Sequence, residues 1–125
     1  MNIVNKNAFF GFVNTNIEEL TDAKAHSYEC VINAFLNKEH TDSRWLAYIL
    51  ATIRHEQIQV SDPIDAGTII DSMVNGTITG KALSQYLTLT KTDFKNSRRV
   101  YRADKADAEI VAALSYPYMN ALNRE

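Results

Sequence analysis

Residues 41–56 read Thr41-Asp42-Ser43-Arg44-Trp45-Leu46-Ala47-Tyr48-Ile49-Leu50-Ala51-Thr52-Ile53-Arg54-His55-Glu56, and the rest of the chain is arranged around them. Asp42 suits the N-cap of a helix, because its carboxylate can accept a hydrogen bond from an amide of the first turn. Apolar side chains then recur at the spacing of one helical face, namely Trp45, Leu46, Ile49, Leu50 and Ile53. At roughly 100° per residue, Glu56 falls near this face and Arg54 points away from it. The segment predicts a helix that is apolar on one side and ends in a carboxylate.

The position of Glu56 has a chemical consequence. Burial against apolar walls raises the pKa of a carboxyl group, and the negative end of a helix acts in the same direction. Glycosidases use such a group as their general acid. The alternative is a solvated carboxylate in the last turn of the helix, because acids are rarely buried.

Helical periodicity extends over the other patterned segments of the chain. We expect helices at 5–13, at 22–36 after the cap Thr21, at 63–74 between Asp62-Pro63 and Gly76, at 80–87 after Thr79, from 94 after Asp93, and from about 105 after Asp104. Pro117 should kink or end the last helix near Tyr116. No segment alternates as a strand does, and only 57–61 could be extended. The expectation is a single all-α domain over residues 1–125, with six to seven helices.

The periodicity also selects the side chains that should face inward. In the second helix these are Tyr28, Val31, Ile32 and Phe35, and in the fourth they are Ile64, Ile69, Ile70, Met73 and Val74. In the later segments they are Leu83, Leu87, Phe94, Val100, Ile110, Val111 and Leu114.

Composition narrows the functional classes. The chain is 46% apolar and 22% charged, with a net charge of −2, which does not favour a nucleic-acid partner. Cys30 is the only cysteine, which excludes an internal disulfide, and we expect a buried thiol. His55-Glu56 lacks the second histidine of a zinc-protease motif, so we expect no metal and no cofactor. We see no secretory signal and no membrane segment, and expect a cytoplasmic protein.

The segment from Trp45 to Glu56 resembles the W-L-A-Y-x-L-A-T-x-x-H-E motif of phage endolysins. These are lysozyme-like enzymes related to glycoside hydrolase family nineteen, the chitinase family. Later segments are similar to this family as well: 73–86 to G-x-F-T-G-K-x-L-x-D-Y, 93–100 to D-F-x-N-A-R-R-I, and 104–107 to D-K-A-D. The resemblance implies a lysozyme-like helical fold, action on peptidoglycan, and Glu56 as the catalytic acid.

One part of the family pattern is missing. Endolysins carry a long insert between the H-E and T-G-K motifs, with a small sheet that forms one wall of the sugar cleft and supplies a catalytic threonine. Here only residues 57–72 separate Glu56 from Met73. Asp65, nine positions after Glu56, matches the place of the second catalytic acid in the family's Q-P-I-E segment. It would position the attacking water, or it is only a first-turn acid favoured by the helix dipole.

Basic residues gather in one predicted helix and its flanks, at Lys91, Lys95, Arg98, Arg99 and Arg102. A charged run of this kind is usually a solvated face. The resemblance implies a second role, because the family's Asn-x-Arg-Arg segment lines the glycan site. The candidate binding residues are therefore Asn96, Arg98 and Arg99, with Tyr48 from the first motif. An anionic partner is the third interpretation.

Two functions remain open. The chain is a shortened endolysin, impaired or inactive, that binds or slowly cuts cell-wall glycan. Alternatively, it is a phage scaffold that lost this chemistry and binds a host protein, for example as an inhibitor of a host defence system. Loss of a sheet exposes core, which favours a partner or a homodimer. We expect weak or no lytic activity, because hydrolysis needs an acid, a positioned water and sugar subsites.

Overall fold

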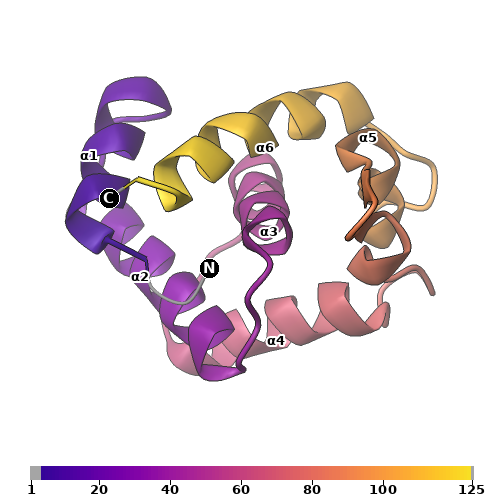
Figure 1. The fold of residues 1–125 in the computed structure, drawn as a ribbon. Helices are drawn as coiled ribbons and strands as arrows, with labels where there is room; N and C mark the ends of the chain where they lie inside the picture. Colours follow the sequence, from indigo (N-terminus) through magenta and orange to yellow (C-terminus); the bar gives the residue numbers. More distant parts are fainter. Residues whose placement is uncertain (1–3, 125) are drawn as a thin grey trace.

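The fold consists of helices packed around one central helix (Figure 1). The computed structural model describes residues 4–124, and within them lie six α-helices: α1 (Lys6–Asn16), α2 (Asp22–Asn37), α3 (Ser43–Glu56), α4 (Pro63–Asn75), α5 (Phe94–Ser97) and α6 (Ala108–Leu122). Two short 3₁₀ helices, η1 (Leu83–Gln85) and η2 (Arg98–Val100), and two short strands complete it. The prediction of an all-α fold is confirmed. Every helix in 4–124 is too short or too polar to cross a lipid bilayer.

The central helix α3 lies with α6 above it, α4 below it, and α1, α2 and α5 at the flanks in Figure 1. Its eight consecutive residues 46–53 are all buried. The expectation of a helix with one apolar face is therefore too narrow. Ala47 and Ala51 have small side chains and lie on other sides of α3 than Ile49 and Leu50. Neighbouring helices can therefore pack closely on those sides as well.

The helix starts predicted at Thr21, Asp42 and Asp62 are confirmed. Thr21, Asp42 and Asp62 accept hydrogen bonds from amides two or three residues further on, at 3.2, 2.9 and 2.8 Å. Gly76 ends α4 with a φ of 76°, a conformation that costs glycine little. These boundaries are local decisions, which explains why sequence predicts them well.

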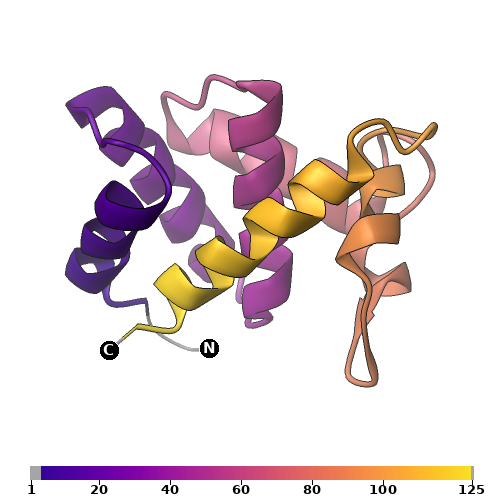
Figure 2. The same cartoon turned by 90° about the horizontal axis from the view of Figure 1, so that it is seen from above.

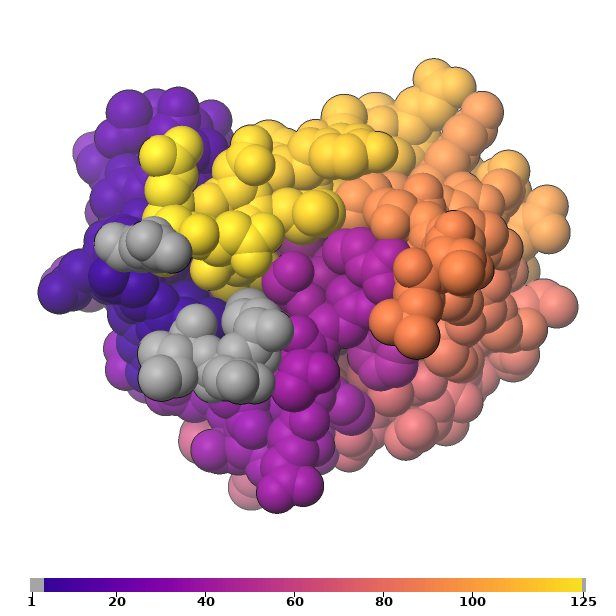
Figure 3. Space-filling view, in the orientation of Figure 1, coloured from indigo at the N-terminus to yellow at the C-terminus, as the bar shows by residue number. Residues whose placement is uncertain are grey.

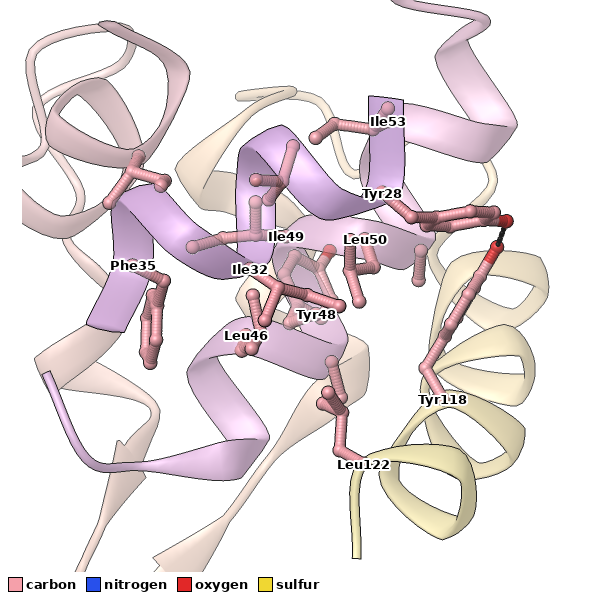
Figure 4. Packing of buried hydrophobic residues seen from close by; sticks show 14 of the residues in the cluster. Tyr28, Ile32, Phe35, Leu46, Tyr48, Ile49, Leu50, Ile53, Tyr118 and Leu122 are labelled. Carbon is pink, nitrogen blue, oxygen red and sulfur yellow. Dashed lines mark hydrogen bonds between the residues drawn. The ribbon is translucent and has the colours of Figure 1, made fainter. Parts of the chain in front are cut away.

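One core cluster joins buried residues of all six α-helices, and Figure 4 shows the part of it around α2, α3 and α6. The predicted inward face of α2 is confirmed, because Tyr28, Val31, Ile32 and Phe35 are all buried. The hydroxyl groups of Tyr28 and Tyr118 meet at 2.6 Å and join α2 to α6. Cys30 is buried as expected.

Two predicted inward residues point outward instead. Ile64 in α4 is 79% exposed, because the buried side of that helix is set by Ala66, Ile70 and Met73. Ile110 in α6 is 51% exposed, because that helix turns Val111 and other residues towards α3. In both helices more apolar side chains are present than one face can bury.

The helix predicted at 80–87 is reduced to the short 3₁₀ helix η1, and a hairpin follows it. After η1, strand β1 (Leu87–Thr88) pairs antiparallel with β2 (Lys91–Thr92). The indole of Trp45 donates to the Leu87 carbonyl at 3.0 Å, and Arg44 Nη1 donates to the Lys91 carbonyl at 3.0 Å. Side chains from the start of α3 thus satisfy the hairpin backbone, which local periodicity could not reveal.

The ends of α6 also differ from the prediction. Asp104 accepts from the amide of Ala106 at 3.0 Å in a turn, and the helix begins only at Ala108. Pro117 lies inside the helix, which continues to Leu122. Buried side chains on both sides of the proline, including Val111 and Leu122, hold the two halves of the helix against the core. Likewise, α1 continues to Asn16, beyond the end predicted at 13, and Thr79 bonds to the Val100 carbonyl at 3.2 Å instead of capping a helix.

Candidate functional site

The C-terminal end of α3 carries the two residues of the H-E motif. His55 Nε2 lies 2.9 Å from an Asp107 carboxylate oxygen, just before α6. Glu56 is the last residue of α3, and Gln57 ends the helix in the left-handed conformation with a φ of 54°. Both side chains therefore face the segment that connects η2 to α6.

Two arginines enclose the Glu56 carboxylate. Arg98, whose side chain is 1% exposed, contacts Oε1 through Nη2 and also donates from Nε to the Ala106 carbonyl at 2.6 Å. Arg102 lies on the solvent side, with its Nη2 3.0 Å from Oε2. The Glu56 side chain keeps only 13% exposure. The carboxylate is thus bound through both oxygens before any ligand is considered.

These arginines set the charge of Glu56. The hydrogen bond from Arg102, and the hydrogen bond and charge of Arg98, lower the pKa of Glu56 more than burial raises it. The expectation of a raised pKa is therefore wrong. Glu56 is a carboxylate at neutral pH, whereas a general acid must hold a proton.

Asp65 lies in the first turn of α4, as the second interpretation of this residue required. It is exposed, its amide donates to the cap residue Asp62, and Ser61 Oγ donates to its carboxylate at 3.3 Å. Its neighbours are thus those of a helix start. Its catalytic role stays a prediction.

The basic residues do not form one exposed helical face, because Lys91 lies in β2 and Arg98 is buried. Arg98 and Arg102 turn inward to Glu56. Lys95 pairs with Glu109 of α6 at 3.4 Å, and both of these side chains are well exposed. Of the expected basic stripe, Arg98 and Arg102 therefore belong to an ion-pair cluster with Glu56, whereas Lys95 is exposed to solvent.

The candidate glycan-binding residues are separated by the fold. Tyr48 is fully buried and stacks on Phe94, with the ring centroids 6.2 Å apart, and burial raises the pKa of its hydroxyl. A glycan on the surface cannot reach it, so this expectation is wrong for Tyr48. Asn96 is half-buried and donates to Asp93 at 2.8 Å, whereas Arg99 is exposed.

Sequence reasoning missed a polar seam inside the core. Among residues 4–124, the buried atoms Tyr48 Oη, Thr52 Oγ1 and Arg98 Nη1 have no hydrogen-bond partner. Tyr48, Thr52 and Glu56 follow one another at four-residue spacing and so lie along one side of α3. That spacing of polar residues in an otherwise apolar helix was the available signal.

A groove of about 560 Å³ lies on another side of the α3 end, between the start of α2 and residues 57–61. Glu18 is one of its walls, with Arg54 Nη1 at 2.7 Å and Lys24 Nζ at 2.9 Å. Burial alone would raise the pKa of Glu18. The hydrogen bond from Tyr28 and the two cations lower this pKa by more than burial raises it, so the net shift is downward. Glu56 does not line this groove. No pattern in the sequence marks Glu18, because its partners Lys24, Tyr28 and Arg54 come from other segments.

Searches among protein-family models, curated proteins and solved structures find no match to this chain. The resemblance to endolysins therefore stays a prediction based on the motifs.

Proposed function

We propose that this chain is a lysozyme-like scaffold that has lost glycan hydrolysis and acts by binding a host protein. One observation supports the loss of chemistry above all others. The carboxylate of Glu56, the candidate acid, is held by Arg98 and Arg102 and stays ionised at neutral pH.

The chemistry of glycoside hydrolysis explains why this matters. The reaction needs a protonated carboxyl group beside the leaving oxygen and a second carboxylate about 5–10 Å away. Glu56 has no proton to give, and the groove at this end of the molecule is lined by neither Glu56 nor Asp65. The same arginines suit a structural role, because they tie the end of α3 to the 98–106 segment.

Hydrolysis is tested with purified peptidoglycan in a turbidity assay. We compare the wild type with Glu56→Gln and Arg102→Ala, and include a lysozyme as the positive control. Arg102→Ala removes the solvent-side partner of Glu56, which should make Glu56 easier to protonate and so favour any activity as a general acid. We expect no clearing from any of the three. Clearing by the wild type that disappears in Glu56→Gln would overturn the proposal.

Protein binding is tested by capture followed by reconstitution. Tagged protein is expressed in a bacterial host, and co-purifying proteins are compared with those of a tagged control of similar size and charge. A candidate counts only when it forms a stoichiometric complex from purified components in sedimentation. If no host protein passes this second step, the binding half of the proposal fails while the hydrolysis result stands.

A second candidate function is non-hydrolytic glycan binding in the groove beside α2. Its volume of about 560 Å³ is within the range of roughly 300–1,000 Å³ that ligand sites occupy. Tyr28, Ile58 and Arg54 give it both apolar and polar walls. An NMR titration with an N-acetylglucosamine tetramer tests it. Saturable shifts at Ile58 and Val60 would support this function, and their absence at millimolar glycan would exclude it.

A further inference from the structure

The segment that joins η2 to α6 contributes no side chain to the hydrophobic core. Residues 101–107, here called the strap, lie between Val100 and Ala108, which are both buried. Within the strap only Tyr101 and Lys105 are partly covered, and the other residues are exposed. Figure 2 shows the strap as the orange-to-gold loop beyond the start of α6, and Figure 3 shows this part of the chain at the upper right rim of the molecule. Segments without buried apolar contacts open at a low cost in free energy.

The backbone of the strap is held in an unfavourable conformation. Lys105 has a φ of 60° and Asp107 has a φ of 61°, which lie in the left-handed region that residues with a side chain seldom adopt. Strain of this kind persists only where surrounding contacts compensate it. Opening of the strap releases the strain, which favours the open state.

The compensating contacts lead to the C-terminal end of α3 and are polar. His55 Nε2 lies 2.9 Å from the Asp107 carboxylate, and Arg102 Nη2 lies 3.0 Å from Glu56 Oε2. The side chains on the strap, Asp107 and Arg102, are 54% and 52% exposed. Contacts between groups this exposed stabilise little, because water can replace them.

Arg98 lies between the strap and the polar seam. Its Nε donates to the Ala106 carbonyl of the strap at 2.6 Å and its Nη2 contacts Glu56, whereas its Nη1 is buried without a partner. Burial raises the pKa of Tyr48 and the charge of Arg98 opposes this rise, so the guanidinium borders the seam. The hydroxyl groups of Tyr48 and Thr52 also lack partners within residues 4–124. Solvent would satisfy these groups once the strap had lifted away from Arg98, which again favours opening.

We propose that the strap opens while the core stays folded, and that its opening admits solvent to the polar seam of Tyr48, Thr52 and Arg98. Arg102 moves away with the strap, so the Glu56 carboxylate loses its solvent-side cation and becomes accessible. The strap is thus a gate that sets the surroundings of the candidate acid. The inference does not depend on the proposed function.

A thiol placed in the seam reports this opening. Thr52→Cys is combined with Cys30→Ala, and the reaction of the new thiol with an aromatic disulfide reagent is followed in increasing urea. Ser115→Cys in the same background is the matched control, because Ser115 is also fully buried but lies in α6. Local opening exposes little surface and so depends weakly on urea, whereas global unfolding depends on it strongly.

The two positions should behave differently. We expect the thiol at position 52 to react at least about tenfold faster than global unfolding allows, with a weak dependence on urea. The thiol at position 115 should react only through global unfolding. Reaction at position 52 that follows global unfolding at every urea concentration would overturn the proposal, and so would equally fast reaction at position 115.

Loss of the contacts that hold the strap should increase the opening. His55→Ala combined with Arg102→Ala removes both side-chain contacts described above between the strap and α3, and should speed the reaction at position 52 about tenfold relative to global unfolding. Arg99→Ala is the matched control, since Arg99 is a neighbouring exposed arginine whose side chain makes no polar contact within residues 4–124, and it should change the rate by about twofold at most. An unchanged rate in the double variant would contradict the proposal.

A measurement on the wild type avoids any effect of substitution on folding. The Nε proton of Arg98 is bonded to the Ala106 carbonyl of the strap, so its exchange with solvent, followed by NMR, reports the same opening. We expect this exchange to depend weakly on urea. Exchange with the full urea dependence of global unfolding would show that the strap opens only when the whole domain unfolds, and would overturn the proposal.

Discussion

Replacing Arg98 with methionine is the sharpest perturbation of the ion-pair cluster. Methionine fills similar space but removes the cation from a side chain that is 1% exposed. The Glu56 carboxylate then loses its buried partner and the Ala106 carbonyl loses a donor. Breaking a buried pair by removing one member costs about 3–5 kcal/mol. Glu56 keeps Arg102 and 13% of its exposure, so we expect the lower end, about 3 kcal/mol.

The loss is measured by urea unfolding, followed through circular dichroism and Trp45 fluorescence. For a domain of this size, about 3 kcal/mol corresponds to roughly 12 °C in the melting temperature. Arg102→Ala is the internal control, because its side chain is 52% exposed and should matter far less. A double variant, Glu56→Leu with Arg98→Met, should recover most of the loss, since apolar groups can replace a buried pair.

The ranking of these three variants tests the reasoning directly. If Arg98→Met changes the free energy of unfolding by no more than about 0.5 kcal/mol, the size of an ordinary surface substitution, the cluster does not stabilise the fold. If the double variant is less stable than Arg98→Met alone, the cost does not arise from an unpaired buried charge. Either result would remove the basis for calling Glu56 a structural residue.

Three further predictions concern pH, a helix start and two glycines. Because the pKa of Glu56 is lowered in the folded protein, its ionised carboxylate stabilises the fold at pH values above its usual pKa near 4.5. This stabilisation is lost as the pH falls through the pKa of the folded state. The difference in free energy of unfolding between the wild type and Glu56→Gln should therefore shrink below about pH 4.5 in chemical unfolding curves. Asp62→Ala should lower the free energy of unfolding in urea by about 1 kcal/mol, because it removes the α4 cap. Asp65→Asn should change it by less than about 0.5 kcal/mol, and a large effect would contradict the assignment of Asp65 as a first-turn acid. Gly80→Ala should lower the stability measured in a thermal melt by about 1 kcal/mol, because residue 80 has a φ of 85° while a Cβ there would meet no other atom within 4 Å. Gly76→Ala should cost more, because its new Cβ would also lie 3.0 Å from the Lys81 carbonyl carbon.

Much of the helical framework was predictable because its causes are local. Asp42 and the Asp62-Pro63 pair begin helices through bonds to amides within three residues. The buried face of α2 follows from side-chain spacing alone. The hairpin after Leu87 was not predictable, since Trp45 and Arg44 hold its backbone from more than forty residues away.

The candidate site shows the same division. Motif and spacing identified Glu56 but predicted a raised pKa, because the helix sequence contains no sign of what lies opposite it. Arg98 was placed on a solvated stripe, and in the structure it is the most deeply buried charge among residues 4–124. Its inward direction is held by contacts with Glu56 and with the Ala106 carbonyl, which come from other segments of the chain.

The sequence by itself determined that this chain is helical, where most helices begin, and that an acid ends the central one. These features depend on capping side chains and on periodicity, which act over a few residues. Only the tertiary structure decided the state of that acid, because a pKa depends on charges within a few ångströms in space. Arg98 and Arg102 are more than forty residues from Glu56 along the chain, and they meet it only when η2 and the turn after it pack against the end of α3.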